Sequence, residues 1–546
     1  MPDAVVIGAG PNGLVAANHL ADAGWSVHVL EAEATPGGAV RSAELTEPGF
    51  VHDVFSAFYP LAAASPAFTS LKLERWGLRW RHGPLVLAHP TGGDCVVLSR
   101  DLDETAASLD AFAAGDGDAW RRLFELFARL RPHLLRGMTT PLPPVRATLG
   151  LAAVLRADLP RFLRLGLLGV RRLAEEEFRG AGAARLLAGN ALHADLGPEQ
   201  PPGGFFGWFL CGLGQAVGFP FPEGGAQRLT DALVARLRDR GGELSCGVRV
   251  TRVVVRGNRA VGVRTADGTV VPARRAVLAD TMPGMLYGEL LELRHVPARL
   301  ARDLERMQLD TATFKLDWAL DGPIPWRAEE ARRAPVVHVA ESVDELTQSA
   351  AELAQGLVPA RPFLVLGQYA LGGAGDPSRC PPGKEVAWAY THVPQRIRGD
   401  ASGELSGSWD PAEAERFAAR MEQRVEALAP GFKALVRTRH VLTPRDLEER
   451  DANLVGGALN GGTSQLHQQL FLRPTPGLGR PGTPVAGLYL ASAAAHPGGG
   501  VHGGPGMIAA RAALHADRAT KLAVALGAVA ALAAVRRRAS PRRPDR

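Results

Sequence analysis

Cysteine is scarce in this chain. Its 546 residues include four cysteines, and no two of them form a CxxC pair. A redox-active disulfide of the CxxC type therefore has no local candidate. So few cysteines also argue against a secreted protein stabilised by disulfides. No group of histidines and cysteines has the spacing of a metal site.

Long apolar runs are also missing. The segment Leu522–Val535 carries no polar or charged side chain but has only 14 residues, whereas a membrane span needs about 20. Between Arg536 and Arg546 six arginines and one aspartate follow, which supply +5 of the net charge of +6. We expect residues 518–546 to form an apolar, then basic tail that either packs on the protein or lies on a membrane surface.

A strong excess of one charge is absent from the rest of the chain, which is nearly neutral. A nucleic-acid partner is therefore not indicated. No charged and then apolar leader precedes the first strand. We expect a cytoplasmic protein, peripheral on the inner membrane if the tail binds lipid. The length predicts two or more domains, and the oligomeric state is left open.

The first residues carry a dinucleotide-binding pattern. Ala4–Ile7 is an apolar run of strand length, and the turn Gly8-Ala9-Gly10-Pro11-Asn12-Gly13 follows it directly. Gly8 permits the tight turn, Gly10 lets the backbone approach a pyrophosphate, and Gly13 lets the next helix pack on the strand. The helix expected over Leu14–Ala23 directs its N-terminal N–H groups at the phosphates.

An acidic residue and a second pair of glycines refine this pattern. Glu31 ends the second expected strand, Val27–Leu30. A carboxylate there binds ribose hydroxyls and repels a 2′-phosphate, which disfavours NADP. Gly37 and Gly38 permit backbone contact with the cofactor, and Arg41 offers donors to a phosphate. This second segment favours FAD over NAD.

Another glycine-rich loop lies near the C-terminus. A strand expected over Gly487–Ser492 leads into the loop His496–Gly506, and a helix is expected from Met507 to about Asp517. A strand, a glycine loop and a helix start direct backbone N–H groups at negative charge. The sequence therefore predicts that both ends of the chain contribute to one cofactor site.

These segments and two others resemble one family. The two others are Pro222-Glu-Gly-Gly-Ala-Gln-Arg-Leu-Thr-Asp-Ala-Leu233 and Asp376-Pro-Ser-Arg-Cys-Pro-Pro-Gly383. With them the chain resembles the flavin-dependent phytoene desaturase and amine oxidase superfamily, and looks most like the branch that contains the pyridine nucleotide-disulfide oxidoreductase domain-containing protein 2. The resemblance implies an α/β fold, in which a Rossmann-like FAD-binding domain of the amine oxidase type carries a discontinuous α+β substrate domain.

The resemblance also implies how the chain is divided and which residues contact FAD. The FAD-binding domain would comprise residues 1–63, 221–290 and 451–517, with a helical substrate region at 64–220, a second substrate section at 291–450 and the tail at 518–546. Val250 would lie beside the adenine through its backbone, and Ala276–Ala279 would return to the Rossmann sheet. The implied cofactor-binding residues are Gly8, Gly10, Pro11, Asn12, Gly13, Glu31, Gly37, Gly38, Arg41, Val250, Ser492, Gly500 and Val501.

The function implied is an FAD-dependent oxidoreductase, phytoene dehydrogenase-like, that desaturates or oxidises an apolar substrate by hydride transfer to flavin N5. A flavin amine oxidase is one alternative, although such enzymes often carry an acidic residue where this chain has Ser492. A flavoprotein that acts mainly through a protein partner in respiratory regulation is another. No catalytic side chain is assigned. The polar residues near the motifs are His52, Asp53, Ser56, His193, Asp195, His467 and His502.

Two apolar segments bear on the substrate. Phe205–Leu210 either lines a nonpolar channel or belongs to the core. Residues 147–173 are rich in leucine and arginine, and Asp158 and Pro160 are expected to break them into two helices. Such a stretch either covers a core or forms an apolar entrance for a lipid-like compound.

Overall fold

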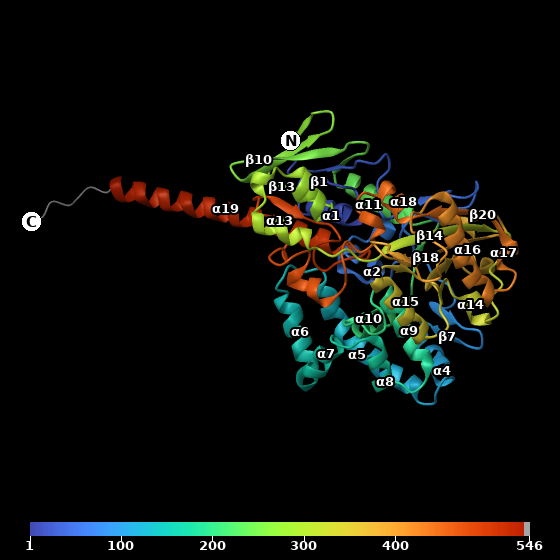
Figure 1. The fold of residues 1–546 in the computed structure, drawn as a ribbon. Helices are drawn as coiled ribbons and strands as arrows, with labels where there is room; N and C mark the ends of the chain where they lie inside the picture. The colour runs from blue at the N-terminus through green and yellow to red at the C-terminus, as the bar shows by residue number, and fades with distance from the viewer. Residues whose placement is uncertain (540–546) are drawn as a thin grey trace, which may run out of the picture.

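The computed structural model describes the backbone of residues 1–539 and the side chains of residues 1–522. Three regions adjoin one another: a parallel sheet with its helices, a larger mixed sheet, and a group of helices that Figure 1 shows in cyan below both sheets. The chain passes between these regions several times, so that each is assembled from distant segments.

The parallel sheet has the strand order β21-β13-β1-β2-β9. Every neighbouring pair in it is parallel. Its strands are β1 (Ala4–Ile7), β2 (Val27–Leu30), β9 (Glu243–Ser245), β13 (Ala276–Ala279) and β21 (Leu488–Leu490). Parallel strands covered on both faces are apolar throughout, and β1 and β13 are entirely buried. The strand Ala276–Ala279 does return to this sheet, between β1 and β21.

Three helices cover this sheet. They are α1 (Pro11–Asp22), α11 (Gln227–Asp239) and α19 (Gly504–Ala539), and α1 packs against both of the others. The expected start of the last helix at Met507 is wrong, because the helix already begins at Gly504 within the glycine loop. Helix α19 also continues through the apolar segment of the tail, although the side chains after Leu522 and the backbone after Ala539 lie outside the described residues.

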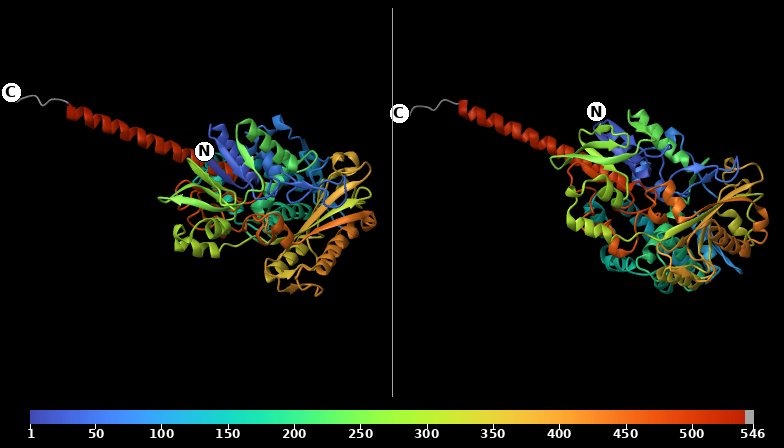
Figure 2. Two further views of the ribbon diagram at one scale, coloured as in Figure 1. Left: turned by 90° about the horizontal axis from the view of Figure 1, so that it is seen from above. Right: turned by 45° about the horizontal axis from the view of Figure 1, so that its top comes forward.

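A smaller antiparallel sheet lies at the edge of the molecule (Figure 2). It consists of β10 (Val250–Arg256), β11 (Arg259–Thr265) and β12 (Val270–Pro272), with Asn258 at positive φ in the first turn. The sequence alone also predicts one strand over 243–255, and this prediction is wrong. Gly247, with a φ of +71°, separates β9 from β10, which belong to different sheets.

The larger sheet has seven strands in the order β20-β14-β18-β17-β15-β6-β7. Its strands are β6 (Leu87–Pro90), β7 (Cys95–Leu98), β14 (Ala312–Leu320), β15 (Val336–Val339), β17 (Leu364–Gln368), β18 (Glu385–Val393) and β20 (Val436–Leu442). Helix α16 (Pro411–Leu428) packs on one face through Phe417 and Met421. The sequence predicts Asp410 as the cap of this helix, and its carboxylate does accept the Glu413 N–H.

The helical region forms the third part. Its helices are α4 (Leu102–Asp110), α5 (Asp116–Gly137), α6 (Val145–Leu155), α7 (Leu159–Leu165), α8 (Val170–Glu177), α9 (Ala181–Leu192) and α10 (Gly203–Val217). A short 3-10 turn, Arg156–Asp158, separates α6 from α7 at the break that the sequence predicts. The segment 64–220 is not purely helical, because it also supplies β6 and β7 to the larger sheet.

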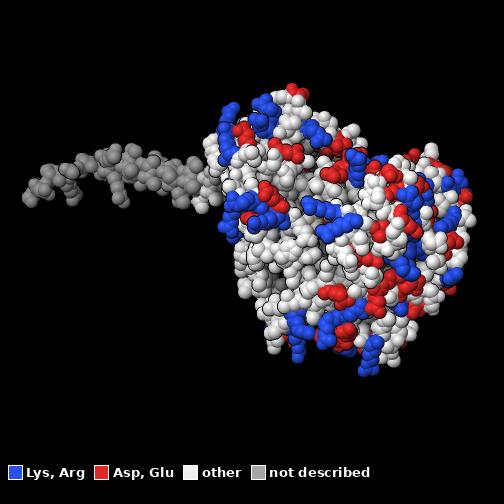
Figure 3. All heavy atoms as spheres, viewed as in Figure 1, with Lys and Arg blue, Asp and Glu red and all other residues white. Residues whose placement is uncertain are grey.

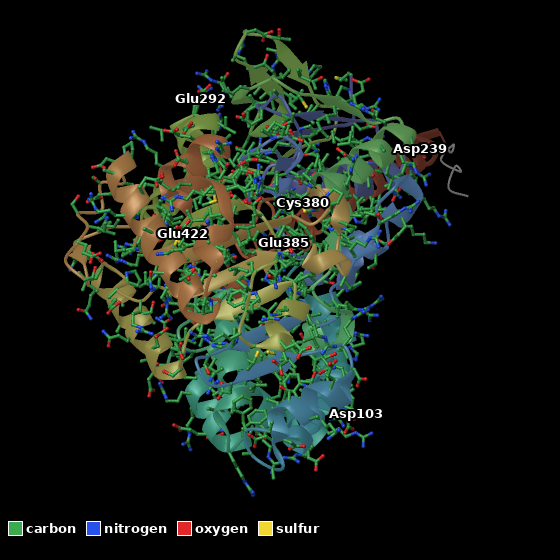
Figure 4. All side chains as sticks on the ribbon, turned by 90° about the vertical axis from the view of Figure 1, so that its right-hand side faces the viewer. Asp103, Asp239, Glu292, Cys380, Glu385 and Glu422 are labelled. Atoms are coloured by element: carbon green, nitrogen blue, oxygen red, sulfur yellow. The ribbon has the colours of Figure 1, made fainter. Side chains whose placement is uncertain are left out.

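Short elements connect these parts. They include β3 (Ser42–Ala43), β4 (His52–Asp53), α2 (Pro60–Ala64), α3 (Pro66–Thr69), β5 (Trp80–Arg81), β8 (Phe221–Pro222), α13 (Ala298–Glu305), α14 (Glu329–Arg333), α15 (Val343–Gln355), α17 (Phe432–Leu435) and α18 (Pro444–Arg450). Figure 4 shows Glu385 in the interior, where it accepts N–H groups from Tyr369, Ala370 and Leu371, and shows Asp103 at the surface. No helix of the described residues has the length and apolar character needed to cross a membrane.

Candidate active site

The turn between β1 and α1 is packed so tightly that only glycine fits at its key positions. Gly8 has a φ of +92°. A Cβ on Gly13 would lie 2.2 Å from the Gly8 carbonyl oxygen, and a Cβ on Gly10 would lie 2.8 Å from Oδ2 of Asp280. Helix α1 begins at Pro11, directly after this turn. Its positive end therefore meets whatever group binds beside Pro11 and Asn12.

The Glu31 carboxylate is fixed beside this turn. It is 8% exposed, and it accepts N–H groups from Ala9 at 2.7 Å and from Glu33 at 2.8 Å. The Val248 N–H donates to the Glu31 carbonyl at 2.8 Å, which brings the segment before Val250 alongside. Val250 itself is buried at the start of β10. This arrangement agrees with the predicted ribose and adenine contacts, which stay predictions.

The segment with the second glycine pair lies on the same turn. The Gly37 N–H donates to the Ala9 carbonyl at 2.9 Å, and a Cβ on Gly38 would lie 3.1 Å from the Gly10 Cα. Arg41 donates to the carbonyls of Gly38 and Arg450, at 2.9 and 2.6 Å. Its guanidinium is thus held by the backbone, and its contact with a phosphate stays a prediction.

The C-terminal loop meets the N-terminal turn from the other side. The Ala491 N–H donates to the Ala279 carbonyl at 2.8 Å, which places Ser492, a buried residue, at the end of β21. Gly500 has a φ of +93°, and a Cβ there would lie 2.9 Å from the Leu61 side chain. Gly500 and Val501 line the same cavity as Pro11 and Asn12. The structure therefore brings the two ends of the chain together, as the sequence predicts.

That cavity has a volume of about 1250 Å³ and extends from the nucleotide-binding turn to the helical region. Most of its wall is apolar, and α10 contributes Phe205, Phe206, Phe209 and Leu210. No aspartate or glutamate is among the described residues that line it, whereas three cationic residues are: Lys315, Arg473 and Arg480. The segment Phe205–Leu210 thus lines the cavity and also packs in the adjoining core.

Several polar atoms on the cavity wall have no hydrogen-bond partner among the described residues. They are Oδ1 of Asn12, Nδ1 of His133, Oγ1 of Thr313, Nε of Arg473 and both ring nitrogens of His496. Buried polar atoms are normally satisfied. A flavin dinucleotide carries ring carbonyls, ring nitrogens and phosphates that can pair with such atoms, and the N-terminus of α1 lies on the same wall. The residues present therefore fit FAD.

Arg473 is a buried cation beside the C-terminal loop. It is 1% exposed, and it donates to backbone carbonyls, among them Asn460 at 2.7 Å and Thr463 at 3.0 Å. Burial lowers the pKa of Arg473 to about 10, so the group stays charged at neutral pH. Its guanidinium carbon lies 3.3 Å from the position that a Cβ on Gly498 would take. A cation here favours an electron-rich group in the cavity.

His496 is a neutral imidazole on the cavity wall. Burial lowers its pKa to about 4. His193 also lines the cavity, and its Nε2 lies 2.8 Å from Nε2 of His338. Burial lowers the pKa of His193 to about 4 as well. Both rings are therefore uncharged at neutral pH, but only His496 lacks a partner among the described residues.

The other polar residues near the motifs have mainly structural contacts. Asp53 accepts both guanidinium nitrogens of the fully buried Arg379 at 3.0 Å, and Asp195 accepts the Thr311 N–H at 2.6 Å. His52 lies 3.5 Å from Asp317, and His467 is exposed. His502 accepts the Gly504 N–H at 3.0 Å, at the start of α19. Of this group only Ser56, His193 and His502 line the cavity.

Asp280 is a site residue that the sequence analysis does not single out. It follows β13 directly, and its Oδ2 accepts the Gly13 N–H at 2.8 Å. Burial raises the pKa of Asp280 to about 8, and the carboxylates of Asp451 and Glu31 add to the effect although the Gly13 N–H opposes it. An acidic residue directly after a fully apolar strand is the signal that could have identified it.

Two family models match the chain. One, for an NAD(P)-binding Rossmann-like domain, matches residues 6–71, and one for a flavin containing amine oxidoreductase matches residues 96–505. The fold and the cavity define a flavoprotein oxidoreductase with a Rossmann-like nucleotide-binding domain. The chain belongs to the flavin containing amine oxidoreductase family, within the superfamily that also contains the phytoene desaturases.

Its relatives span nearly the whole chain. It is 28% identical to the pyridine nucleotide-disulfide oxidoreductase domain-containing protein 2 of Mus musculus, over 93% of this chain and 92% of that protein. It is 27% identical to the lycopene-forming phytoene desaturase of Pseudescherichia vulneris, over 93% and 97%. The structure of cyclohexylamine oxidase from Brevibacterium oxydans matches with a TM-score of 0.57 at 17% identity, over 95% and 99%. This last similarity concerns the fold alone.

Proposed function

We propose that this flavoprotein oxidises or desaturates an uncharged, apolar substrate in the manner of a phytoene dehydrogenase. The observation that carries the proposal is the cavity wall, which is largely apolar and includes no carboxylate among the described residues. A cationic amine would meet Lys315 and Arg473 there without a balancing acid on the wall. The phytoene desaturase among the relatives supports the same class of substrate.

The residues of the chain would bind and orient both molecules. When bound, FAD accepts a hydride or its equivalent from the substrate. The aromatic side chains of α10 exclude water from the cavity, and Trp388 and Tyr390 of β18 stack at 6.0 Å between ring centroids to form part of its wall. Nδ1 and Nε2 of His496 are available to donate or accept one hydrogen bond each.

The amine oxidase alternative has one structural feature in its favour. Trp388 and Tyr390 supply the aromatic wall that the loop after Tyr489 does not. The electrostatic objection to a cationic amine is weaker at Lys315, because its ammonium group binds the carboxylate of Asp317. The objection remains at Arg473. Action mainly through a protein partner would require neither a substrate nor an apolar cavity of this size.

The test is the visible spectrum of the purified protein, held without oxygen, before and after addition of a lipid extract of the host. Bleaching of the flavin bands by the lipids but not by a set of primary and secondary amines would support the proposal. Bleaching by amines alone would establish the amine oxidase instead. A flavin that neither set reduces, in a protein that stably captures a partner, would favour the partner function.

The cellular location also belongs to the proposal. A cytoplasmic protein that is peripheral on the inner membrane fits a substrate drawn from lipid. Residues 518–546 would assist through their apolar run and the six arginines between Arg536 and Arg546. Replacing those arginines by glutamine in the full chain should lower the fraction recovered with membranes, and an unchanged fraction would contradict a role for the tail.

A further inference from the structure

The exposed apolar side chains of this protein are concentrated in one place. Among the described residues, eleven large apolar side chains are exposed, and seven of them lie in residues 145–168 and 466–471. We call these seven the apolar rim: Val145, Leu149, Leu163, Leu167, Leu466, Leu470 and Phe471. Single exposed leucines are ordinary, but a contiguous group marks an interaction site.

The apolar rim surrounds the opening of the cavity. Leu163, Leu466, Leu470 and Phe471 line the cavity themselves. Val145, Leu149 and Leu167 each follow a lining residue directly in sequence. Leu163 and Phe471 are 60% and 65% exposed, although they are also part of the wall. The same apolar surface therefore continues from the outside of the molecule to its interior.

The rim is accompanied by positive charge. Residues 131–168 contain six arginines and a single acidic residue, Asp158. Arg161 pairs with Asp158 and Arg164 with Glu176, whereas Arg136, Arg146 and Arg156 are exposed and form no ion pair within the described part of the chain. Figure 3 shows an area without charged side chains over α6, with basic side chains below it near α7.

We propose that the apolar rim docks on the surface of an anionic phospholipid bilayer and places the cavity opening against the acyl chains. Exposed leucines and a phenylalanine would enter the boundary between headgroups and chains, and the arginines would meet the phosphates. A folded protein partner seated on the rim would cover the opening. A bilayer would instead leave the opening in contact with acyl chains, through which an apolar compound can enter the cavity. The inference concerns binding and does not require that catalysis follow.

The first experiment reports where the protein touches the membrane. In the full chain with Cys95→Ser and Cys246→Ser, an environment-sensitive fluorophore is attached at Val145→Cys or, as a matched control, at Val270→Cys. Val270 is also an exposed valine, at 44% against 56% for Val145, but it lies on β12, away from the rim. With phosphatidylglycerol-containing vesicles, the emission at position 145 should shift to the blue and that at position 270 should not.

A second experiment measures affinity. The variant with Leu163→Ser, Leu470→Ser and Phe471→Ser should bind the same vesicles roughly tenfold more weakly than the unaltered protein, at equal flavin content. Unaltered vesicle affinity, or equal blue shifts at both labelled positions, would overturn the proposal. Vesicle binding that vanishes only when the arginines of the tail are replaced would also overturn it. Rim-dependent binding without bleaching by lipids would retain this inference and reject the proposed substrate.

Discussion

The two ends of the cavity differ in what holds their atoms in place. At the nucleotide end the backbone is in contact with itself, and a single added methyl group at Gly13 would lie 2.2 Å from the Gly8 oxygen. At the substrate end the wall consists of side chains from α5, α6, α7, α10 and the loop 466–471, and its margin is open to solvent. We therefore expect the first end to recognise its ligand by fixed backbone geometry and the second to select a class of ligand by apolar shape.

This difference explains why the cofactor is better defined than the substrate. At the nucleotide end, backbone geometry, the fixed carboxylate of Glu31 and the start of α1 supply directional groups for the predicted dinucleotide contacts. A largely apolar wall offers few directional contacts, so it selects by volume and by the absence of charge. Substitutions at the two ends should therefore separate cofactor content from ligand binding.

The largest effect is expected for Glu31→Arg. It replaces the carboxylate at the predicted ribose position by a cation and removes the acceptor of the Ala9 N–H. FAD affinity should fall roughly 100-fold or more, as measured by flavin absorbance per protein after dialysis. Glu33→Arg is the control, because the side chain of Glu33 is 46% exposed and lies 4.0 Å from the guanidinium of Arg249. Full flavin content in Glu31→Arg would contradict the assignment.

The next effect concerns Asp280→Asn and depends on pH. The pKa of Asp280 in the folded protein, about 8, exceeds the ordinary value of 3.8. The folded state therefore holds this proton more tightly, and stability falls as the pH rises from about 4 to about 8. The asparagine variant should avoid that loss and gain roughly 2 kcal/mol over the unaltered protein by pH 9, with little difference at pH 4.

The control for that measurement is Asp3→Asn, because the pKa of Asp3 is shifted in the opposite direction from that of Asp280. Burial would raise the pKa of Asp3, but the Ser26 N–H and the guanidinium groups of Arg274 and Arg275 lower it overall. Its contribution to stability is present above the ordinary pKa and disappears as the pH falls through the lower folded value. Asp3→Asn should thus lose stability at neutral pH. Parallel pH curves of thermal unfolding for both variants would show that Asp280 is not protonated in the folded protein.

A smaller effect is expected at the other end of the cavity. Leu210→Asp places a carboxylate on a wall that carries none among the described residues. Affinity for a neutral apolar fluorescent probe should fall about tenfold, while flavin content should stay near normal. Leu210→Met, of similar volume, should bind the probe as the unaltered protein does. Loss of flavin together with the probe would indicate that the two ends are not separable.

The smallest effect is expected for Asp410→Ala, outside both ends. The carboxylate of Asp410 caps α16 through the Glu413 N–H at 2.9 Å. Its removal should lower the unfolding temperature slightly, because the Glu413 N–H loses its acceptor, without a change in flavin content or probe binding. Asp410→Asn, which keeps a capping oxygen, should lose much less. A drop in flavin content would show that stability of the larger sheet controls the nucleotide end.

The nucleotide end could be predicted because its determinants are close together in sequence. The spacing of Gly8, Gly10 and Gly13 between a strand and a helix defines one local geometry, and Glu31 follows at the end of the next strand. The cap at Asp410 is equally local. Each of these features depends on hydrogen bonds or steric limits within a few residues, so the pattern alone is sufficient.

The residues that were missed act through contacts between distant segments. Asp280 meets Gly13 only because β13 enters the sheet beside β1, and Arg473 joins loops around Asn460 and Ala493. The division of 243–255 into two strands and the entry of β6 and β7 into the larger sheet are likewise tertiary outcomes. No local pattern records which distant strand will become a neighbour.

The strand order of the parallel sheet also limits when its strands can pair during synthesis of the protein. Strand β1 is made before its neighbours, since β13 follows some 270 residues later and β21 nearly 500 residues later. The loop with Gly500 and Val501, which lines the cavity, follows β21. Chains usually fold in the order in which they emerge. Here the parallel sheet and the cavity are assembled from segments made hundreds of residues apart, so neither can be complete before the loop with Gly500 and Val501 has emerged.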